Sequence, residues 1–264
     1  MREKGVEPDL PIISALISAF GASKNVDGVR SATRSALQLE NVDSRLFVDI
    51  ICAFSSCHAY QEALDIFHSS ECPKNVQTCT AAMQAYVDLG NVKDAESIYF
   101  KMKLNKFEGG YGFLPNARAH TTILNGYEKS LMWNNAVNLL RKLEQLSIVN
   151  GEKDFLPNEI HYNVALSACG KCGEWITAES IFHAMRARGI WTSNITFNTL
   201  IIAYGRNGET FRASCLYNLM RNEGIVPDDY SFVGLILGHA ANHDLRAALD
   251  IKNLILSENV RETV

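Results

Sequence analysis

The sequence predicts an all-α protein, an α-solenoid of stacked antiparallel helix-turn-helix hairpins. Three observations lead to this prediction: a turn recurs at a nearly fixed interval, apolar residues recur at helical spacing between the turns, and a short break divides each interval in two. The turns lie 32 to 42 residues apart and end at Asp9, Asp43, Asn75, Asn116, Asn158, Ser193 and Asp228. A period of this size is typical of repeat arrays, in which each unit buries its apolar face by stacking on its neighbours.

Residues 194–228 show the pattern most clearly. The spacing of their first apolar residues predicts an amphipathic helix with an inward face of Phe197, Leu200, Ile201 and Tyr204. Gly208 ends this helix, because a residue without Cβ can turn the chain there. A second helix follows and ends at Gly224, before Pro227, with predicted inward residues Phe211, Ala213, Leu216, Tyr217 and Met220.

The same order of elements predicts one continuous solenoid domain. Residues 1–9 match the end of a repeat, so we expect a fragment of a longer array. The repeats are predicted at 10–43, 44–75, 76–116, 117–158, 159–193, 194–228 and, in degenerate form, 229–264. A small residue opens the packed part of most second helices, which permits close helix approach: Ala63, Ala95, Ala136, Ala178, Ala213 and Ala248.

Two repeats, 76–116 and 117–158, are longer than the others, and their extra residues follow the second helix at Asn105–Gly112 and Ser147–Asp154. We expect surface loops at both places, because long loops cost little free energy. The alternative is that the two loops form a docking site for a partner.

Composition narrows the function. The chain has 264 residues, 47% of them hydrophobic, a net charge of -4 and no apolar run long enough to span a membrane. The negative charge argues against a protein that coats nucleic acid by electrostatics alone. Seven cysteines without a secretory signal favour a reducing compartment over a disulfide framework.

The sequence favours no enzyme, metal or cofactor. Cys169 and Cys172 form a C-x-x-C pair without the second pair that a zinc site needs, so we expect Cys169 in the core. His239 and His243 lie one turn apart without an accompanying glutamate motif. The glycines at 109–112 lie in an insertion and not between a strand and a helix, which disfavours a phosphate loop.

The chain resembles the pentatricopeptide repeat family. The resemblance is carried by Asn194–Tyr204 with Val226-Pro227-Asp228, and by Ile160-His161-Tyr162-Asn163 with Ala168–Gly173. It covers essentially the whole chain and is specific in residues 159–228, moderate in 76–158, and weak in 10–75 and 229–264. It implies a right-handed superhelix that binds single-stranded RNA, one base per repeat, in a mitochondrion or plastid, with other RNA-processing proteins of the organelle as further partners.

In this family the fifth residue and the last residue of a repeat together read one base. The resemblance therefore implies six reading pairs: Ser14 with Asp43, Val48 with Asn75, Thr80 with Asn116, Thr121 with Asn158, Asn163 with Ser193, and Asn198 with Asp228. By the family's rules these pairs favour the RNA element 5′-GnAACU-3′, in which Val48 leaves the second base open because valine cannot hydrogen-bond.

The family's second residue stacks between successive bases and is usually apolar. Ile160 and Ile195 fit this role, whereas Pro11, Arg45, Gln77 and Arg118 depart from it. Lys129, Lys171 and Arg206 each lie eight residues after a fifth position and are candidates for phosphate contacts, with ordinary solvated helix ends as the alternative. A different functional class also remains open, a scaffold that binds a protein partner on its concave face.

Overall fold

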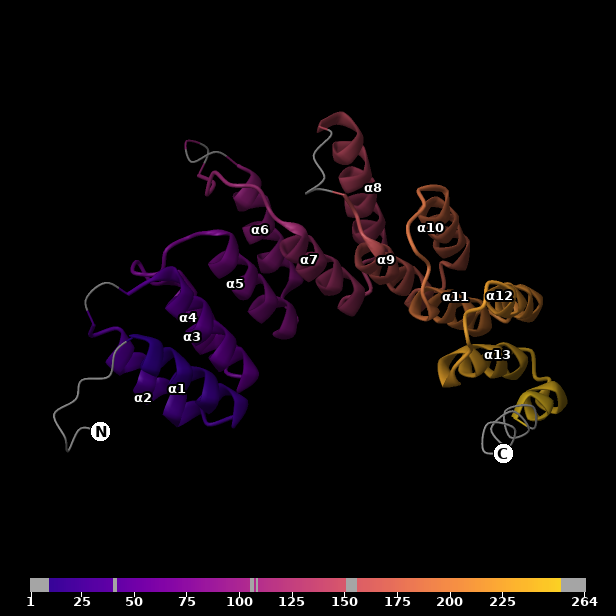
Figure 1. Cartoon of the computed structure of the whole chain (residues 1–264), viewed down its shortest axis with the longest axis horizontal. Helices are drawn as coiled ribbons and strands as arrows, with labels where there is room; N and C mark the ends of the chain where they lie inside the picture. The colour runs from indigo at the N-terminus through magenta and orange to yellow at the C-terminus, as the bar shows by residue number, and fades with distance from the viewer. Residues whose placement is uncertain (1–9, 40–41, 105–106, 108, 151–155, 253–264) are drawn as a thin grey trace. The chain divides into compact units, whose positions relative to one another are not determined.

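The computed structural model describes residues 10–39, 42–104, 107, 109–150 and 156–252. Within these ranges the regular secondary structure is helical, which confirms the predicted all-α repeat solenoid (Figure 1). The helices form hairpins in chain order: α1 (Leu10–Ala22) and α2 (Val26–Ala36), α3 (Ser44–Ser56) and α4 (Tyr60–His68), α5 (Val76–Asp88) and α6 (Val92–Lys103), α7 (Ala117–Lys129) and α8 (Trp133–Asn150), α9 (Glu159–Lys171) and α10 (Trp175–Ala187), α11 (Asn194–Arg206) and α12 (Thr210–Asn222), then α13 (Asp229–Ala241) with a helical segment at 245–252.

The chain divides into two compact units, Met1–Gly126 and Tyr127–Val264. In the first unit, α1 packs on α3 and α3 packs on α5, while α4 packs against α5. In the second unit, α9 packs on α11 and α11 packs on α13, with α10 and α12 each packed against the first helix of the next hairpin. The first helices of successive repeats therefore stack on one another within each unit. The described helices include none with the length and apolar character needed to cross a bilayer.

Within each unit, the core lies between the two helices of a hairpin and between neighbouring hairpins. In the second unit it is continuous from α8 to α13 and includes Tyr162, Phe182, Phe197, Tyr204 and Met220. The rings of Phe182 and Phe197 meet edge to face, with centroids 5.5 Å apart, and join α10 to α11. The alanines expected at close helix approaches, Ala63, Ala95, Ala136, Ala178 and Ala213, are fully buried, whereas Ala248 is half-buried.

The turn between the two helices of each repeat uses the left-handed backbone conformation. The residue that follows the first helix by two positions has positive φ in all seven repeats: Lys24, His58, Gly90, Leu131, Gly173, Gly208 and His243. Glycine adopts this conformation without steric cost, whereas other residues are strained there. Three repeats use glycine at this turn, so four of the seven turns carry strain that a substitution could remove.

Two predictions were wrong, one about packing and one about secondary structure. Phe211 was expected to face inward, yet it is 80% exposed, because it precedes the buried Ala213 by two residues and so lies about 200° around α12. The insertion expected as a loop at Ser147–Asp154 begins as helix, since α8 continues to Asn150. Residues 147–150 contain no glycine or proline, and the first such residue is Gly151. The remainder of this insertion, and residues 105, 106 and 108 of the other, lie outside the described residues.

Candidate nucleic-acid interface

The last residue of a repeat is the N-cap of the next first helix. In five of these residues an oxygen of the side chain accepts hydrogen bonds from backbone N–H groups of the following turn, with the pairs Asp43 to Leu46 at 2.9 Å, Asn75 to Gln77 and Thr78 at 2.9 Å each, Asn116 to Ala119 at 3.0 Å, Asn158 to His161 at 3.3 Å, and Asp228 to Tyr230 at 2.9 Å. Asp, Asn and Ser are the preferred N-cap residues, so capping alone accounts for their recurrence here. A base would have to bind the side-chain donors and lone pairs that these capping hydrogen bonds do not use.

A groove of about 740 Å³ runs along the first helices α3, α5 and α7 in the first unit. It is lined by the predicted reading residues Val48, Thr80 and Asn116. The second-position residues Arg45, Gln77 and Arg118 line the same groove. Thr80 and Asn116 form one of the predicted reading pairs, whereas the predicted partner of Val48, Asn75, does not line the groove. Ser14, Asp43 and Asn75 are not part of this lining.

The hydroxyl groups at the fifth positions of the first unit are already used as donors. Ser14 donates to the carboxylate of Asp49, Thr80 Oγ1 donates to the Val76 carbonyl at 2.6 Å, and Thr121 Oγ1 donates to the Ala117 carbonyl at 3.0 Å. A serine or threonine hydroxyl has one proton and two lone pairs. While these bonds persist, Thr80 can offer a base an acceptor and not a donor, which suits the exocyclic amino group of adenine.

In the second unit, the structure brings Asn198 and Asp228 into direct contact. Asn198 Nδ2 donates to Asp228 Oδ1 at 2.8 Å, although 30 residues separate them. Asn194 Nδ2 donates to the other carboxylate oxygen at 3.0 Å, and Ser231 Oγ donates to Asn198 Oδ1 at 2.5 Å. Asn198 is only 6% exposed, so its remaining hydrogen-bonding capacity is held in one fixed direction.

The second predicted pair of this unit differs in its contacts. Asn163 Nδ2 donates to Glu159 Oε1 at 3.4 Å, and Asn163 Oδ1 is buried without a hydrogen-bond partner in the part of the chain that the structure describes. Ser193 is half-buried, and its backbone N–H donates to Thr196 Oγ1 at 3.3 Å. An unsatisfied buried acceptor is costly and calls for an explanation, and a ligand that donates a hydrogen bond would supply one.

The second position of each repeat points to solvent. Ile160 is 56% exposed and Ile195 is 65% exposed, as stacking residues would have to be. Tyr230, the second residue of the seventh repeat, is 66% exposed and was missed by the sequence analysis. The signal was present in Asp229-Tyr230-Ser231-Phe232, which aligns with Asn194-Ile195-Thr196-Phe197, but the rest of that repeat is degenerate. A tyrosine ring is a better surface for a base than an isoleucine side chain.

The predicted phosphate contacts are the last residues of α7, α9 and α11, namely Lys129, Lys171 and Arg206. All three are exposed, and Lys171 and Arg206 line one hollow of about 130 Å³. Lys171 Nζ also pairs with Glu128 Oε1 at 3.0 Å. An incoming phosphate would have to compete with that carboxylate for the lysine.

The cysteine and histidine side chains that could have suggested a metal or catalytic site lie in the core or at helix ends. Cys169 is fully buried, as predicted, and burial raises the pKa of its thiol to about 12, which makes it a poor nucleophile or metal ligand. His161 completes a capping box with Asn158, and His120 is buried with its ring 5.8 Å from that of Tyr99. His239 faces Asp244 at 3.8 Å. The described residues contain no group of three or more His, Cys, Asp or Glu side chains arranged to hold a metal ion.

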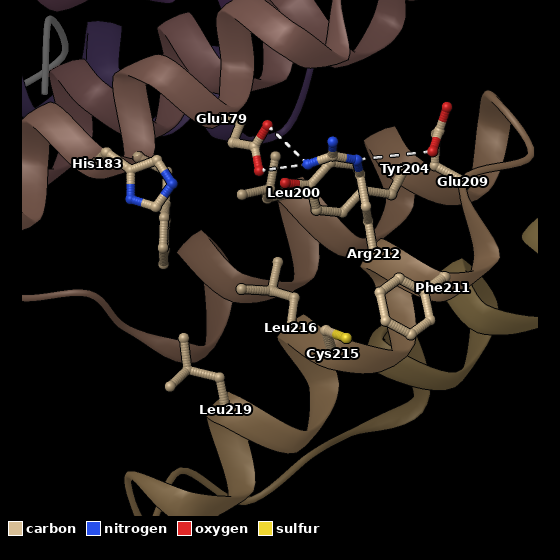
Figure 2. A pocket seen from close by; sticks show the side chains of 11 residues that line it. Glu179, His183, Leu200, Tyr204, Glu209, Phe211, Arg212, Cys215, Leu216 and Leu219 are labelled. Atoms are coloured by element: carbon tan, nitrogen blue, oxygen red, sulfur yellow. Dashed lines mark hydrogen bonds and ion pairs between the residues drawn. The ribbon is translucent and has the colours of Figure 1, made fainter.

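A separate hollow of about 420 Å³ lies between the second helices α10 and α12 (Figure 2). At its polar end Arg212 contacts Glu179 at 2.9 Å and Glu209 at 3.7 Å, and its guanidinium lies 4.8 Å from the Trp175 ring centroid. Phe211, Cys215 and Leu219 form its apolar side. Most of its lining residues belong to α10 and α12, and Leu200 and Tyr204 of α11 also line it, but none of the lining residues is a predicted reading residue.

The chain was compared with known proteins. Models of the pentatricopeptide repeat match residues 77–107 and 160–190, and a model of the pentatricopeptide repeat family matches residues 192–241. The chain is also similar to crystal structures of the pentatricopeptide repeat protein PPR10. The complex with an 18-nt psaJ RNA element has a TM-score of 0.74 and 16% identity over 95% of this chain, and PPR10 from maize has a TM-score of 0.75 and 18% identity over 97%. In both cases this chain spans 35% of the length of PPR10. The search of curated proteins gave no match.

Proposed function

Because this chain is a pentatricopeptide repeat protein, we propose that it binds single-stranded RNA along its first helices and reads about one base per repeat. The observation that carries the proposal is the pair formed by Asn198 and Asp228. Two polar side chains 30 residues apart meet at 2.8 Å, and the exposed side chains of Ile195 and Tyr230 lie one on each of the two helices that carry this site. This arrangement supplies hydrogen-bonding groups for a base edge together with apolar surfaces for its faces.

The groove of the first unit supports the same function. Thr80 and Asn116, the predicted adenine pair, line it together with Arg118, whose guanidinium plane can stack on a base. In the second unit, the hollow beside Lys171 and Arg206 supplies positive charge on the same helices as Asn163 and Asn198, eight residues further along each helix. The net charge of -4 makes such local positive sites, and not the overall charge, the source of attraction for phosphates.

We propose 5′-GnAACU-3′ as the preferred element, and RNA processing or expression in a mitochondrion or plastid as the setting, with binding and no catalysis by this segment. PPR10 was crystallised with an 18-nt psaJ RNA element, which supports RNA as the ligand class. The fold similarity alone does not assign the bases, so the element depends on the six reading pairs.

The test is fluorescence anisotropy of a labelled RNA that contains GnAACU, beside a shuffled RNA and the same sequence as DNA. Selective binding to the first RNA is expected, with affinity that falls as salt rises because phosphate contacts release counterions. Equal binding to all three, or binding to none, would contradict the proposal. The scaffold alternative, in which the concave face takes a largely apolar protein segment, predicts little dependence on salt.

A further inference from the structure

We infer that Ser231 sets the orientation of the Asn198 side-chain amide and thereby makes the sixth repeat select uracil over cytosine. The inference deepens the proposed function and rests on it. Ser231 touches no base itself, because it is fully buried behind Asn198. It is a positioning residue supplied by the third position of the following repeat, on α13.

The hydrogen bonds of Ser231 fix the direction in which its hydroxyl proton points. Its oxygen accepts from the Asp228 backbone N–H at 3.1 Å. Its single proton has a close acceptor in Asn198 Oδ1 at 2.5 Å, compared with 3.4 Å to Asp228 Oδ1. The amide oxygen of Asn198 is therefore held toward Ser231, and the amide nitrogen is held toward Asp228, where it donates at 2.8 Å.

This orientation fixes what the pair can offer to a base. The Nδ2 group of Asn198 has a second proton, and Asp228 Oδ2, which accepts from Asn194 at 3.0 Å, has a second lone pair. The pair thus presents one donor beside one acceptor. Uracil presents the complementary O4 acceptor beside the N3–H donor. Cytosine presents an amino donor and a bare N3 acceptor, so both of its groups would face groups of the same kind.

Asn163 provides an internal contrast at the fifth position of the preceding repeat. Thr196 stands in the place of Ser231, yet no hydroxyl reaches the amide oxygen of Asn163, which is buried and unpartnered among the described residues. Its Nδ2 is turned toward Glu159 instead, at 3.4 Å. An open acceptor suits the amino group of cytosine. The same residue type at the same repeat position therefore offers an acceptor in one repeat and a donor in the next.

The test compares RNAs that carry U or C at the sixth base of GnAACU and measures the ratio of their dissociation constants. The wild-type chain should prefer U by about tenfold, the discrimination expected of one well-placed polar pair. Ser231→Ala should reduce this ratio to about threefold, because it removes one of the two hydrogen bonds that hold the amide and leaves only the bond to Asp228, whereas Ser231→Thr retains the hydroxyl and should keep the preference. Thr196→Ala is the matched control, and it should leave the preference for C at the fifth base unchanged.

An RNA-independent measurement separates this inference from the proposed function. In the free protein, the Asn198 side-chain amide protons should exchange more slowly with solvent in the wild type than in Ser231→Ala, as measured by NMR. Ser231→Cys, which keeps a side chain of similar size with a weaker donor, covers the case in which the alanine variant does not fold, and its U-to-C ratio should be intermediate. Selective RNA binding with an unchanged U-to-C ratio in the alanine or cysteine variant, or equal amide exchange in the variant and the wild type, would overturn the inference while leaving RNA binding intact. Failure of the wild type to bind RNA would instead remove the proposed function, and the specificity role with it.

Discussion

The left-handed turn between the two helices of a repeat predicts opposite changes in stability for substitutions of Lys24 and Gly90, which occupy the same repeat position. Lys24 has a φ of 55° and Gly90 has a φ of 84°, both in the left-handed region and both in the first unit. Exchanging the residue types gives Lys24→Gly and Gly90→Lys. The first should raise the free energy of unfolding and the second should lower it, because only glycine adopts this backbone conformation without a steric clash.

The magnitude follows from the surroundings of the two residues. The left-handed conformation costs a residue with a side chain about 1–2 kcal/mol. Glycine avoids this cost, but its greater loss of backbone entropy on folding offsets about 0.5–1 kcal/mol of the gain. Lys24 is exposed, and a Cβ added to Gly90 would meet no heavy atom within 4 Å, so neither change disturbs packing at Cβ. The net effect is about 0.5–1 kcal/mol in opposite directions.

The assay is urea unfolding followed by circular dichroism on the whole chain. With a slope of about 2 kcal/mol per molar urea, the unfolding midpoint of Lys24→Gly should rise above that of the wild type by about 0.3–0.5 M, and the midpoint of Gly90→Lys should fall by the same amount. A lower midpoint for Lys24→Gly would refute the reasoning, since it would mean that the lysine side chain contributes more than its backbone strain costs. A fall for Gly90→Lys with no change for Lys24→Gly would mean that the strain is relieved in the wild-type lysine turn.

Three further predictions concern other parts of the molecule. Tyr230→Ala should weaken binding of GnAACU followed by a further base by about 1–3 kcal/mol while Tyr230→Phe should not, and equal affinity of the two variants in fluorescence anisotropy would exclude stacking. Glu128→Gln should strengthen RNA binding and steepen its dependence on salt by up to about 0.7 in the log–log slope, because it frees Lys171. The matched control is Glu62→Gln, which removes one of the two carboxylates paired with Arg30 on α2 and should change neither quantity. Gly205→Ala should lower the free energy of unfolding by about 1–3 kcal/mol or more, because its Cβ would lie 2.0 Å from the Gly234 carbonyl oxygen where α11 crosses α13, and an unchanged urea midpoint would contradict that packing.

Much of the fold could be predicted because the apolar period and the turn residues agree. Phe197, Leu200, Ile201 and Tyr204 are buried as their spacing indicates. The first helices begin at residues 10, 44, 76, 117, 159, 194 and 229, where the repeats were predicted to start. A repeated pattern makes such predictions robust, since each copy repeats the signal of the others.

Other features depend on contacts that periodicity does not encode. Phe211 was placed inward on its residue type, although its angular position on α12 faces away from the core. The N-cap role of Asp228 leaves no mark distinct from a base-reading role, because both favour the same residue types. The hydrogen bond from Ser231 to Asn198 joins residues 33 apart and could be found only from the packing of α13 on α11.

The most direct test of the central claim is to change one reading residue and follow the base that it selects. Asn198→Thr keeps Asp228 in place, and by the family's rules a threonine with an aspartate favours G. The wild type should bind GnAACU more tightly than GnAACG, and the variant should reverse that order, with the difference at the sixth base amounting to about 1–3 kcal/mol. An unchanged base preference at the sixth position in the variant would contradict the assignment of Asn198 and Asp228 as a reading pair.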